Sequence, residues 1–125
     1  VVGSGAIGVE FAYFYNSMGT EVTIVEFMPK VVPVEDDDVS KQLERSFKKN
    51  GIKIMTSAEV TSVDTSGKGV KATVKTKKGE EVLEADIVLS AVGIKTNIFI
   101  SIVISTTIVR ERLITTDALL ETVCT

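Results

Sequence analysis

The chain opens with Val1-Val2-Gly3-Ser4-Gly5-Ala6-Ile7-Gly8, a Gly-x-Gly-x-x-Gly loop that links a short apolar run to an amphipathic segment. A second apolar run, Glu21-Val22-Thr23-Ile24-Val25-Glu26, ends in an acid at about the distance from the loop that a dinucleotide site requires. The loop can present backbone N–H groups at a helix N-terminus to a pyrophosphate, and the acid can accept hydrogen bonds from ribose hydroxyls. This combination predicts a bound dinucleotide, whereas the loop alone would also fit an ordinary turn between a strand and a helix.

Each glycine of the loop has a separate predicted role. Gly3 allows the tight turn, Gly5 lets the pyrophosphate approach the backbone, and Gly8 lets the helix lie close to its strand. The N–H groups of Ala6 and Ile7 are expected to face phosphate, with the Ile7 side chain in the core. The loop residues predicted to bind the cofactor are Gly3, Ser4, Gly5, Ala6, Ile7 and Gly8.

The end of the second apolar run indicates which cofactor is bound. The carboxylate of Glu26 fits a free ribose 2′-hydroxyl and would repel a 2′-phosphate, and no arginine occurs in the following Phe27-Met28-Pro29-Lys30. The ammonium group of Lys30 could reach a phosphate, although a solvated surface lysine is the commoner case. NAD is therefore favoured over NADP, with Glu26 and Phe27 in its site.

The composition bounds the remaining possibilities. A chain of 125 residues that is 44% hydrophobic predicts one globular domain, and a net charge of −3 provides no basic field for nucleic acid. The apolar stretch Ile98–Val109 is too short to cross a bilayer, and with no signal segment and one cysteine, Cys124, a cytoplasmic location is expected. The sequence contains no histidine, which excludes imidazole acid–base chemistry and histidine metal ligation within this chain.

The apolar periodicity predicts an α/β fold. A first helix is expected to bury the face formed by Ile7, Phe11, Phe14 and Met18, and to end at Gly19. The acidic run Glu35-Asp36-Asp37-Asp38 suits the start of a second helix that buries Val39, Leu43 and Phe47, because acids complement a helix N-terminus. A metal site is the less favoured interpretation of that run, since adjacent side chains on a helix point in different directions.

Beyond the second helix the period changes to two. A parallel strand at 52–55 precedes three short strands at 59–64, 70–75 and 81–84, which are separated by glycine turns and predict an antiparallel meander. The continuous apolar run 86–92 then predicts a buried parallel strand that ends at Gly93. The expected fold is a Rossmann-like three-layer domain, in which the meander forms the crossover between parallel strands.

Residues 1–11, 21–27 and 90–97 resemble the NAD-binding domain of the pyridine nucleotide-disulfide oxidoreductase family. The segment Arg112-Leu113-Ile114-Thr115-Thr116-Asp117 resembles the next strand region of the family. Two features depart from the family pattern: Thr96 replaces the usual proline, and 99–109 is an apolar, β-prone run without a turn residue.

The resemblance implies a larger homodimeric flavoprotein that uses FAD and NAD and carries its catalytic cysteine pair elsewhere. It places Glu10 near the nicotinamide, Val60 on the adenine side, and Gly93 on the pyrophosphate or nicotinamide side. From the residues alone, Glu10 is equally explained as an acid in the first turn of the helix, Val60 as a strand residue and Gly93 as a turn glycine. We therefore expect residues 1–125 to form the NAD-binding domain. The FAD and interface domains, with which it would pack in the same protein, are expected to lie outside this chain.

Three other interpretations remain open. Another disulfide reductase of the same family would differ in substrate contacts that lie outside this chain. A non-catalytic NAD-sensing Rossmann module shares the loop and the acid but crosses over by a helix, so the predicted meander at 59–84 argues against it. A soluble dehydrogenase would need a catalytic histidine or a tyrosine–lysine pair, and Tyr13 and Tyr15 have no suitably spaced lysine.

Overall fold

The computed structural model describes residues 1–93 and 113–115. Two helices and seven strands lie in these ranges: α1 (Ala6–Ser17), β1 (Thr23–Val25), α2 (Asp37–Lys49), β2 (Lys53–Met55), β3 (Glu59–Asp64), β4 (Val70–Thr76), β5 (Gly79–Ala85), β6 (Val88–Ser90) and β7 (Leu113–Thr115). The apolar run 99–109, the altered Thr96 and the lone Cys124 lie outside the described residues. Among the described residues, none of the helices is long and apolar enough to span a membrane.

The parallel strands meet around Val2. β1 pairs in parallel with β2, and β6 pairs in parallel with β7, while Val2 forms parallel bridges to both Val25 and Ser90. The spatial order is therefore β2, β1, the segment at Val2, β6 and β7. The predicted strands at 21–26 and 86–92 are confirmed with shorter regular cores, and β7 confirms the strand expected near residue 113.

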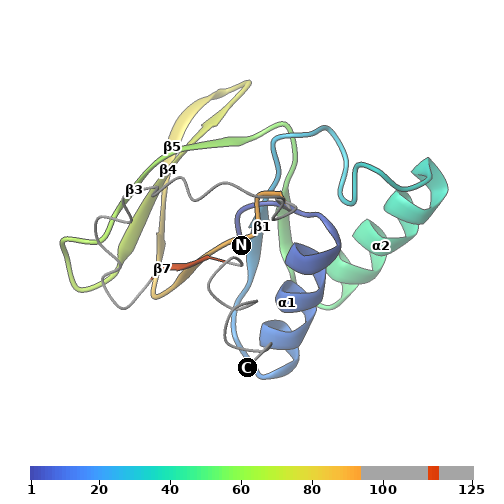
Figure 1. Ribbon diagram of the computed structural model, residues 1–125, viewed down its shortest axis with the longest axis horizontal. Coiled ribbons are helices and arrows are strands. Elements are labelled where there is room, and N and C mark those ends of the chain that lie inside the picture. The colour runs from blue at the N-terminus through green and yellow to red at the C-terminus, as the bar shows by residue number, and fades with distance from the viewer. Residues whose placement is uncertain (94–112, 116–125) are drawn as a thin grey trace, which may run out of the picture.

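Two hydrophobic cores separate the three layers, with α1 and α2 on one side of the parallel strands and the meander on the other (Figure 1). Ile24 of β1 packs with residues of both helices, whereas its neighbour Val25 packs with Val74 of the meander. Successive side chains of a strand point to opposite faces, so β1 contributes to both cores. The three-layer prediction is confirmed.

The meander β3–β4–β5 is antiparallel and takes the place of a crossover helix, as predicted. Val70, Ala72 and Val74 of β4 are buried, and the alternate Lys71 and Lys75 are exposed. This alternation is typical of an antiparallel sheet with one covered face. A register shift between Val60 and Ser62 marks an irregularity in β3.

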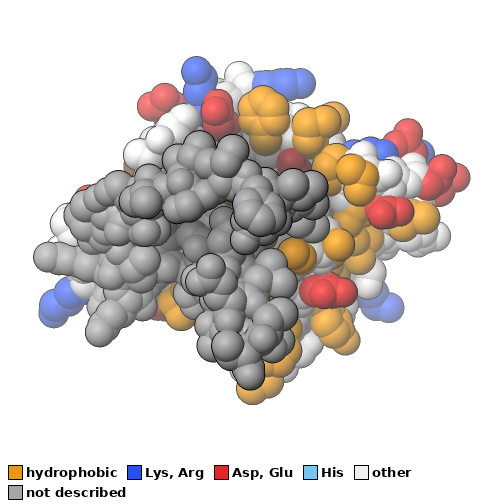
Figure 2. Space-filling view, in the orientation of Figure 1, with side chains coloured by type: hydrophobic (Ala, Val, Ile, Leu, Met, Phe, Trp, Pro, Cys, Tyr) orange, Lys and Arg blue, Asp and Glu red, His pale blue; other side chains and the backbone are white. Residues whose placement is uncertain are grey.

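The buried face of α1 differs from the prediction. Gly8, Val9 and Ala12 are buried, whereas Phe14 is 56% and Met18 is 72% exposed. The sequence pattern predicted burial of the large apolar residues along one face of α1. Because the helix lies close to the sheet, the face with the smaller residues is buried instead. Hydrophobic side chains consequently remain on the surface, and Figure 2 shows them gathered on the side where Figure 1 places the helices.

The acidic run starts α2, as predicted. The carboxylate of Asp36 caps the helix by accepting a hydrogen bond from the Asp38 N–H, and Asp37 forms an ion pair with Lys30. Phe47 is buried, but Val39 is 52% exposed and Ser40 takes the buried position, donating its hydroxyl hydrogen bond to the carbonyl of Val31. The expected burial of Val39 is therefore wrong, because the loop at Val31 offers a polar partner at that position.

Candidate functional site

The glycine loop is held against the end of β6. Gly3 has φ +97°, and a Cβ at this position would lie 2.5 Å from the carbonyl oxygen of Ala91. A Cβ on Gly8 would overlap the carbonyl oxygen of Gly3 and would lie 3.3 Å from the Ala91 Cβ. The turn therefore requires glycine at position 3, and the close helix–loop approach requires it at position 8, which are the roles predicted from the sequence.

Gly5 differs from the other two glycines because open space lies in front of it. A Cβ at position 5 would have no atom of the described residues within 4 Å, and the backbone has an ordinary φ of −65°. Gly5 is also the N-cap of α1, and none of the side chains in the described part of the chain caps the helix there. The first amides of α1, including those of Ala6 and Ile7, are thus free of a side-chain acceptor beside an open space of the kind a phosphate needs.

Glu26 lies directly beside the loop. Its carboxylate is buried, with the residue 6% exposed. Oε2 accepts hydrogen bonds from the Ser4 N–H at 2.7 Å and from the Ser4 hydroxyl at 2.6 Å, and Oε1 accepts one from the Met28 N–H at 2.8 Å. These three bonds hold the acid at the mouth of the turn, as the sequence prediction requires.

Ser4 connects three segments. It is completely buried, both of its donors are directed to Glu26, and its carbonyl accepts a hydrogen bond from the Val32 N–H at 2.9 Å. Val32 has φ +40°, an unusual backbone conformation for a β-branched residue. The loop after β1 is therefore folded back and tied to the glycine loop. The sequence predicted Ser4 as a cofactor contact, and the structure gives its polar hydrogens another partner.

A cavity of about 230 Å³ opens between the glycine loop and the start of the meander. Four of the predicted site residues line it: Gly3, Glu26, Phe27 and Val60. Sequence reasoning missed the other lining residues, Val2, Val25, Ala58, Glu59 and Val92. Ala58 and Glu59 could have been found, because they follow β2, whose carboxyl end adjoins that of β1 in a parallel sheet.

The remaining predicted residues are not among those that line this cavity. Ile7 is half-buried and does not belong to the main core, and Glu10 is exposed in the second turn of α1, so its expected place in the first turn is wrong. Gly93 is exposed with φ +90° and follows Val92, a lining residue.

The cavity carries negative charge. Its lining within the described residues includes the acidic residues Glu26 and Glu59 and neither a lysine nor an arginine. A 2′-phosphate placed there would be repelled by like charges, without a compensating cation among the described lining residues.

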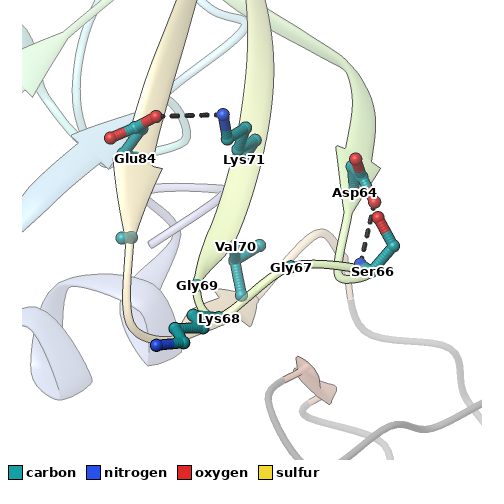
Figure 3. A pocket seen from close by; sticks show the side chains of 9 residues that line it. Asp64, Ser66, Gly67, Lys68, Gly69, Val70, Lys71 and Glu84 are labelled. Atoms are coloured by element: carbon teal, nitrogen blue, oxygen red, sulfur yellow. Dashed lines mark hydrogen bonds and ion pairs between the residues drawn. The ribbon is translucent and has the colours of Figure 1, made fainter.

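A larger cavity of about 430 Å³ lies at the turn between β3 and β4, and the described residues that line it differ from those of the first cavity (Figure 3). Its rim holds the ion pair between Lys71 and Glu84, at 3.2 Å, and the hydrogen bond from the Ser66 N–H to Asp64. That bond holds the pKa of Asp64 below its ordinary value. Because this rim is largely exposed and two of its charged side chains, Lys71 and Glu84, are paired with each other, size alone does not make this cavity the stronger candidate.

The layers, the sheet order and the glycine loop define a Rossmann-like α/β domain. A family model described as pyridine nucleotide-disulphide oxidoreductase matches residues 1–125. The chain belongs to the pyridine nucleotide-disulphide oxidoreductase family. This membership, together with the meander, argues against the NAD-sensing module and the soluble dehydrogenase.

Individual relatives agree with the family assignment. A dihydrolipoyl dehydrogenase from Rhizobium etli is 48% identical over 99 residues, covering 78% of this chain and 21% of that protein. An NAD-dependent persulfide reductase from A. fulgidus has a TM-score of 0.68 at 31% identity, with 77% of this chain and 17% of that one covered. A water-forming NADH oxidase from Lactobacillus brevis, bound to NADH, has a TM-score of 0.59 at 31% identity, with 68% and 18% covered. The chain spans about a fifth of the length of the curated relatives it matches.

Proposed function

We propose that residues 1–125 are the NAD(H)-binding domain of a dihydrolipoamide dehydrogenase, a homodimeric flavoprotein that passes electrons from dihydrolipoamide through a cysteine pair and FAD to NAD. The observation that carries this proposal is the buried Glu26 carboxylate beside an open, uncapped helix N-terminus. The carboxylate fits a ribose, and the helix N-terminus fits a diphosphate.

The residues of this chain fit the cofactor by their donor and acceptor chemistry. The open space at Gly5 leaves room for the pyrophosphate, and the amides of Ala6 and Ile7 are donors for it. Glu26 would accept from the adenosine ribose, while Phe27 and Val60 supply an apolar wall for adenine. Glu10 and Gly93 are proposed to lie toward the nicotinamide, on the family resemblance.

The chain's contribution to the reaction is binding and orientation. When bound, the nicotinamide supplies a two-electron hydride acceptor. The described residues hold the adenosine half of the cofactor, so that the reactive ring is presented to the flavin-bearing part of the protein. We assign no catalytic residue to this chain, and the thiol chemistry and FAD belong to the proposed remainder of the protein.

The proposal is tested by nucleotide affinity in the full-length encoded polypeptide, measured by calorimetry with the flavin oxidised. The wild type is expected to bind NAD⁺ more tightly than NADP⁺. Glu26→Ala should weaken NAD⁺ binding by roughly tenfold or more, the effect of one hydrogen bond to a charged group, and should reduce the preference for NAD⁺. Glu21→Ala is the matched control, because it removes an exposed glutamate just before the same strand. An unchanged NAD⁺ to NADP⁺ ratio in Glu26→Ala would refute the cofactor assignment.

The substrate assignment needs a separate assay. The full-length protein should reduce NAD⁺ with dihydrolipoamide and should not do so with glutathione. Turnover with glutathione alone would favour a sibling reductase of the family, and would leave the cofactor assignment intact.

A further inference from the structure

The Glu26 carboxylate has few free acceptor sites. Two carboxylate oxygens offer about four lone-pair positions in total. Both positions on Oε2 are filled by the N–H and the hydroxyl of Ser4, and one position on Oε1 is filled by the Met28 N–H. The described residues therefore leave a single position unfilled, on Oε1, although an adenosine ribose presents two neighbouring hydroxyls.

Ser4 cannot serve as a direct ligand contact in this arrangement. Its residue is completely buried, and its hydroxyl hydrogen and its N–H point to the same oxygen. The Val32 N–H also fixes its carbonyl, which ties the serine to the folded-back loop. Any effect of the Ser4 side chain on a nucleotide must therefore pass through Glu26.

Resting on the proposed NAD site, we infer that Ser4 is a positioning residue that fills Oε2 of Glu26, so that Glu26 accepts only one adenosine ribose hydroxyl, at Oε1. The serine fixes the plane of the carboxylate before the nucleotide arrives. Charge-assisted bonds of this kind are short and directional, so the fixed plane selects one of the two hydroxyls. Ser4 thereby makes ribose recognition asymmetric.

The test uses redox-inactive probes: ADP-ribose and its two analogues that lack either the 2′- or the 3′-hydroxyl of the adenosine ribose. Affinities are measured by calorimetry on the full-length encoded polypeptide with its flavin oxidised. In the wild type, one deoxy analogue should bind roughly tenfold or more weakly than ADP-ribose, and the other should lie within about twofold of it. In Ser4→Ala the carboxylate is no longer fixed by the side chain, so the difference between the two analogues should fall below about threefold.

Two further variants separate positioning from folding. Ser40→Ala removes the hydroxyl of another buried serine, which bonds to Val31 and not to Glu26, and should keep the asymmetric wild-type pattern. Ser4→Cys retains a side chain in the buried space but donates weakly, so its pattern should lie between those of the wild type and Ser4→Ala. This variant also keeps the test available where Ser4→Ala fails to fold.

Two outcomes overturn the inference while leaving the proposed function in place. Equal losses for both deoxy analogues in the wild type would show that Glu26 accepts two hydroxyls. A Ser4→Ala pattern as asymmetric as that of Ser40→Ala would show that Ser4 does not position the carboxylate. Failure of the wild type to bind ADP-ribose or NAD⁺ at all would instead refute the proposed function, and the inference with it.

Discussion

The two glycines at positions 5 and 8 should respond in opposite ways to the same substitution. An alanine methyl on Gly8 would overlap the Gly3 carbonyl oxygen, whereas one on Gly5 would meet no atom of residues 1–93 or 113–115 within 4 Å. The Gly3 carbonyl cannot easily move, because the Gly3 N–H donates to the Val25 carbonyl at 2.8 Å and the Val2 carbonyl accepts from the Ala91 N–H at 2.7 Å. Gly8→Ala should therefore separate α1 from the loop.

The magnitudes follow from opposing effects. Overpacking costs about 3 kcal/mol at the upper end of its usual range. Alanine favours a helix over glycine by about 1 kcal/mol, so Gly8→Ala should destabilise α1 by about 2 kcal/mol. At Gly5 the loss of a favourable N-cap residue and the gain in chain stiffness nearly cancel, within about 0.5 kcal/mol. The methyl group at position 5 would, however, occupy the space proposed for the pyrophosphate.

Hydrogen exchange of the full-length protein measures the first effect, and calorimetry with ADP-ribose measures the second. Amides of α1 should exchange roughly 30-fold faster in Gly8→Ala, and at nearly the wild-type rate in Gly5→Ala. ADP-ribose should bind Gly5→Ala roughly tenfold or more weakly than the wild type. Wild-type affinity in Gly5→Ala would refute the phosphate assignment, and unchanged exchange in Gly8→Ala would refute the packing argument.

Three further substitutions test the fold around the site. Ile24→Ala removes a completely buried side chain between β1 and the helices and should destabilise the domain by about 3 kcal/mol, measured as faster exchange of the β1 and β2 amides. Asp36→Ala removes the α2 cap and should cost about 1 kcal/mol, measured by exchange of the first α2 amides, whereas the exposed control Glu35→Ala should change it by less than about 0.5 kcal/mol. Lys30 donates a hydrogen bond to Asp37 and holds the pKa of that carboxyl below its ordinary value. The stabilisation from this pair is therefore present above the unfolded-state pKa of Asp37 and is lost as pH falls through its folded-state pKa. Carboxyl NMR should show the Asp37 pKa rising in Lys30→Met.

Features set by local chemistry were predictable from the sequence. The positions of Gly3 and Gly8 follow from a turn and a close approach that no other residue type allows, and Glu26 follows from its place at the end of an apolar strand. The meander was predictable because its period of two contrasts with the helical period before it. The acids at the start of α2 likewise act within one turn of the helix.

Features set by the distance between elements were not predictable. Both the large and the small residues of α1 form lines at helical spacing, and only the separation of the helix from the sheet decides which line is buried. The contact between Ser4 and Glu26 depends on the loop folding back at Val32, which has φ +40°. No sequence pattern predicts this backbone conformation for a valine. The hydrogen bonds that join the segment after β2 to the Glu26 and Met28 carbonyls also form between residues far apart in the sequence, and no local pattern indicates them.

The central claim is that the glycine loop and Glu26 bind one dinucleotide, and a crystal structure of the full-length protein with NAD⁺ tests it most directly. The account predicts the pyrophosphate over Gly5 and one adenosine ribose hydroxyl about 3 Å from Glu26 Oε1, with Ser4 still bonded to Oε2. A nucleotide bound away from the cavity that Glu26 lines would contradict it.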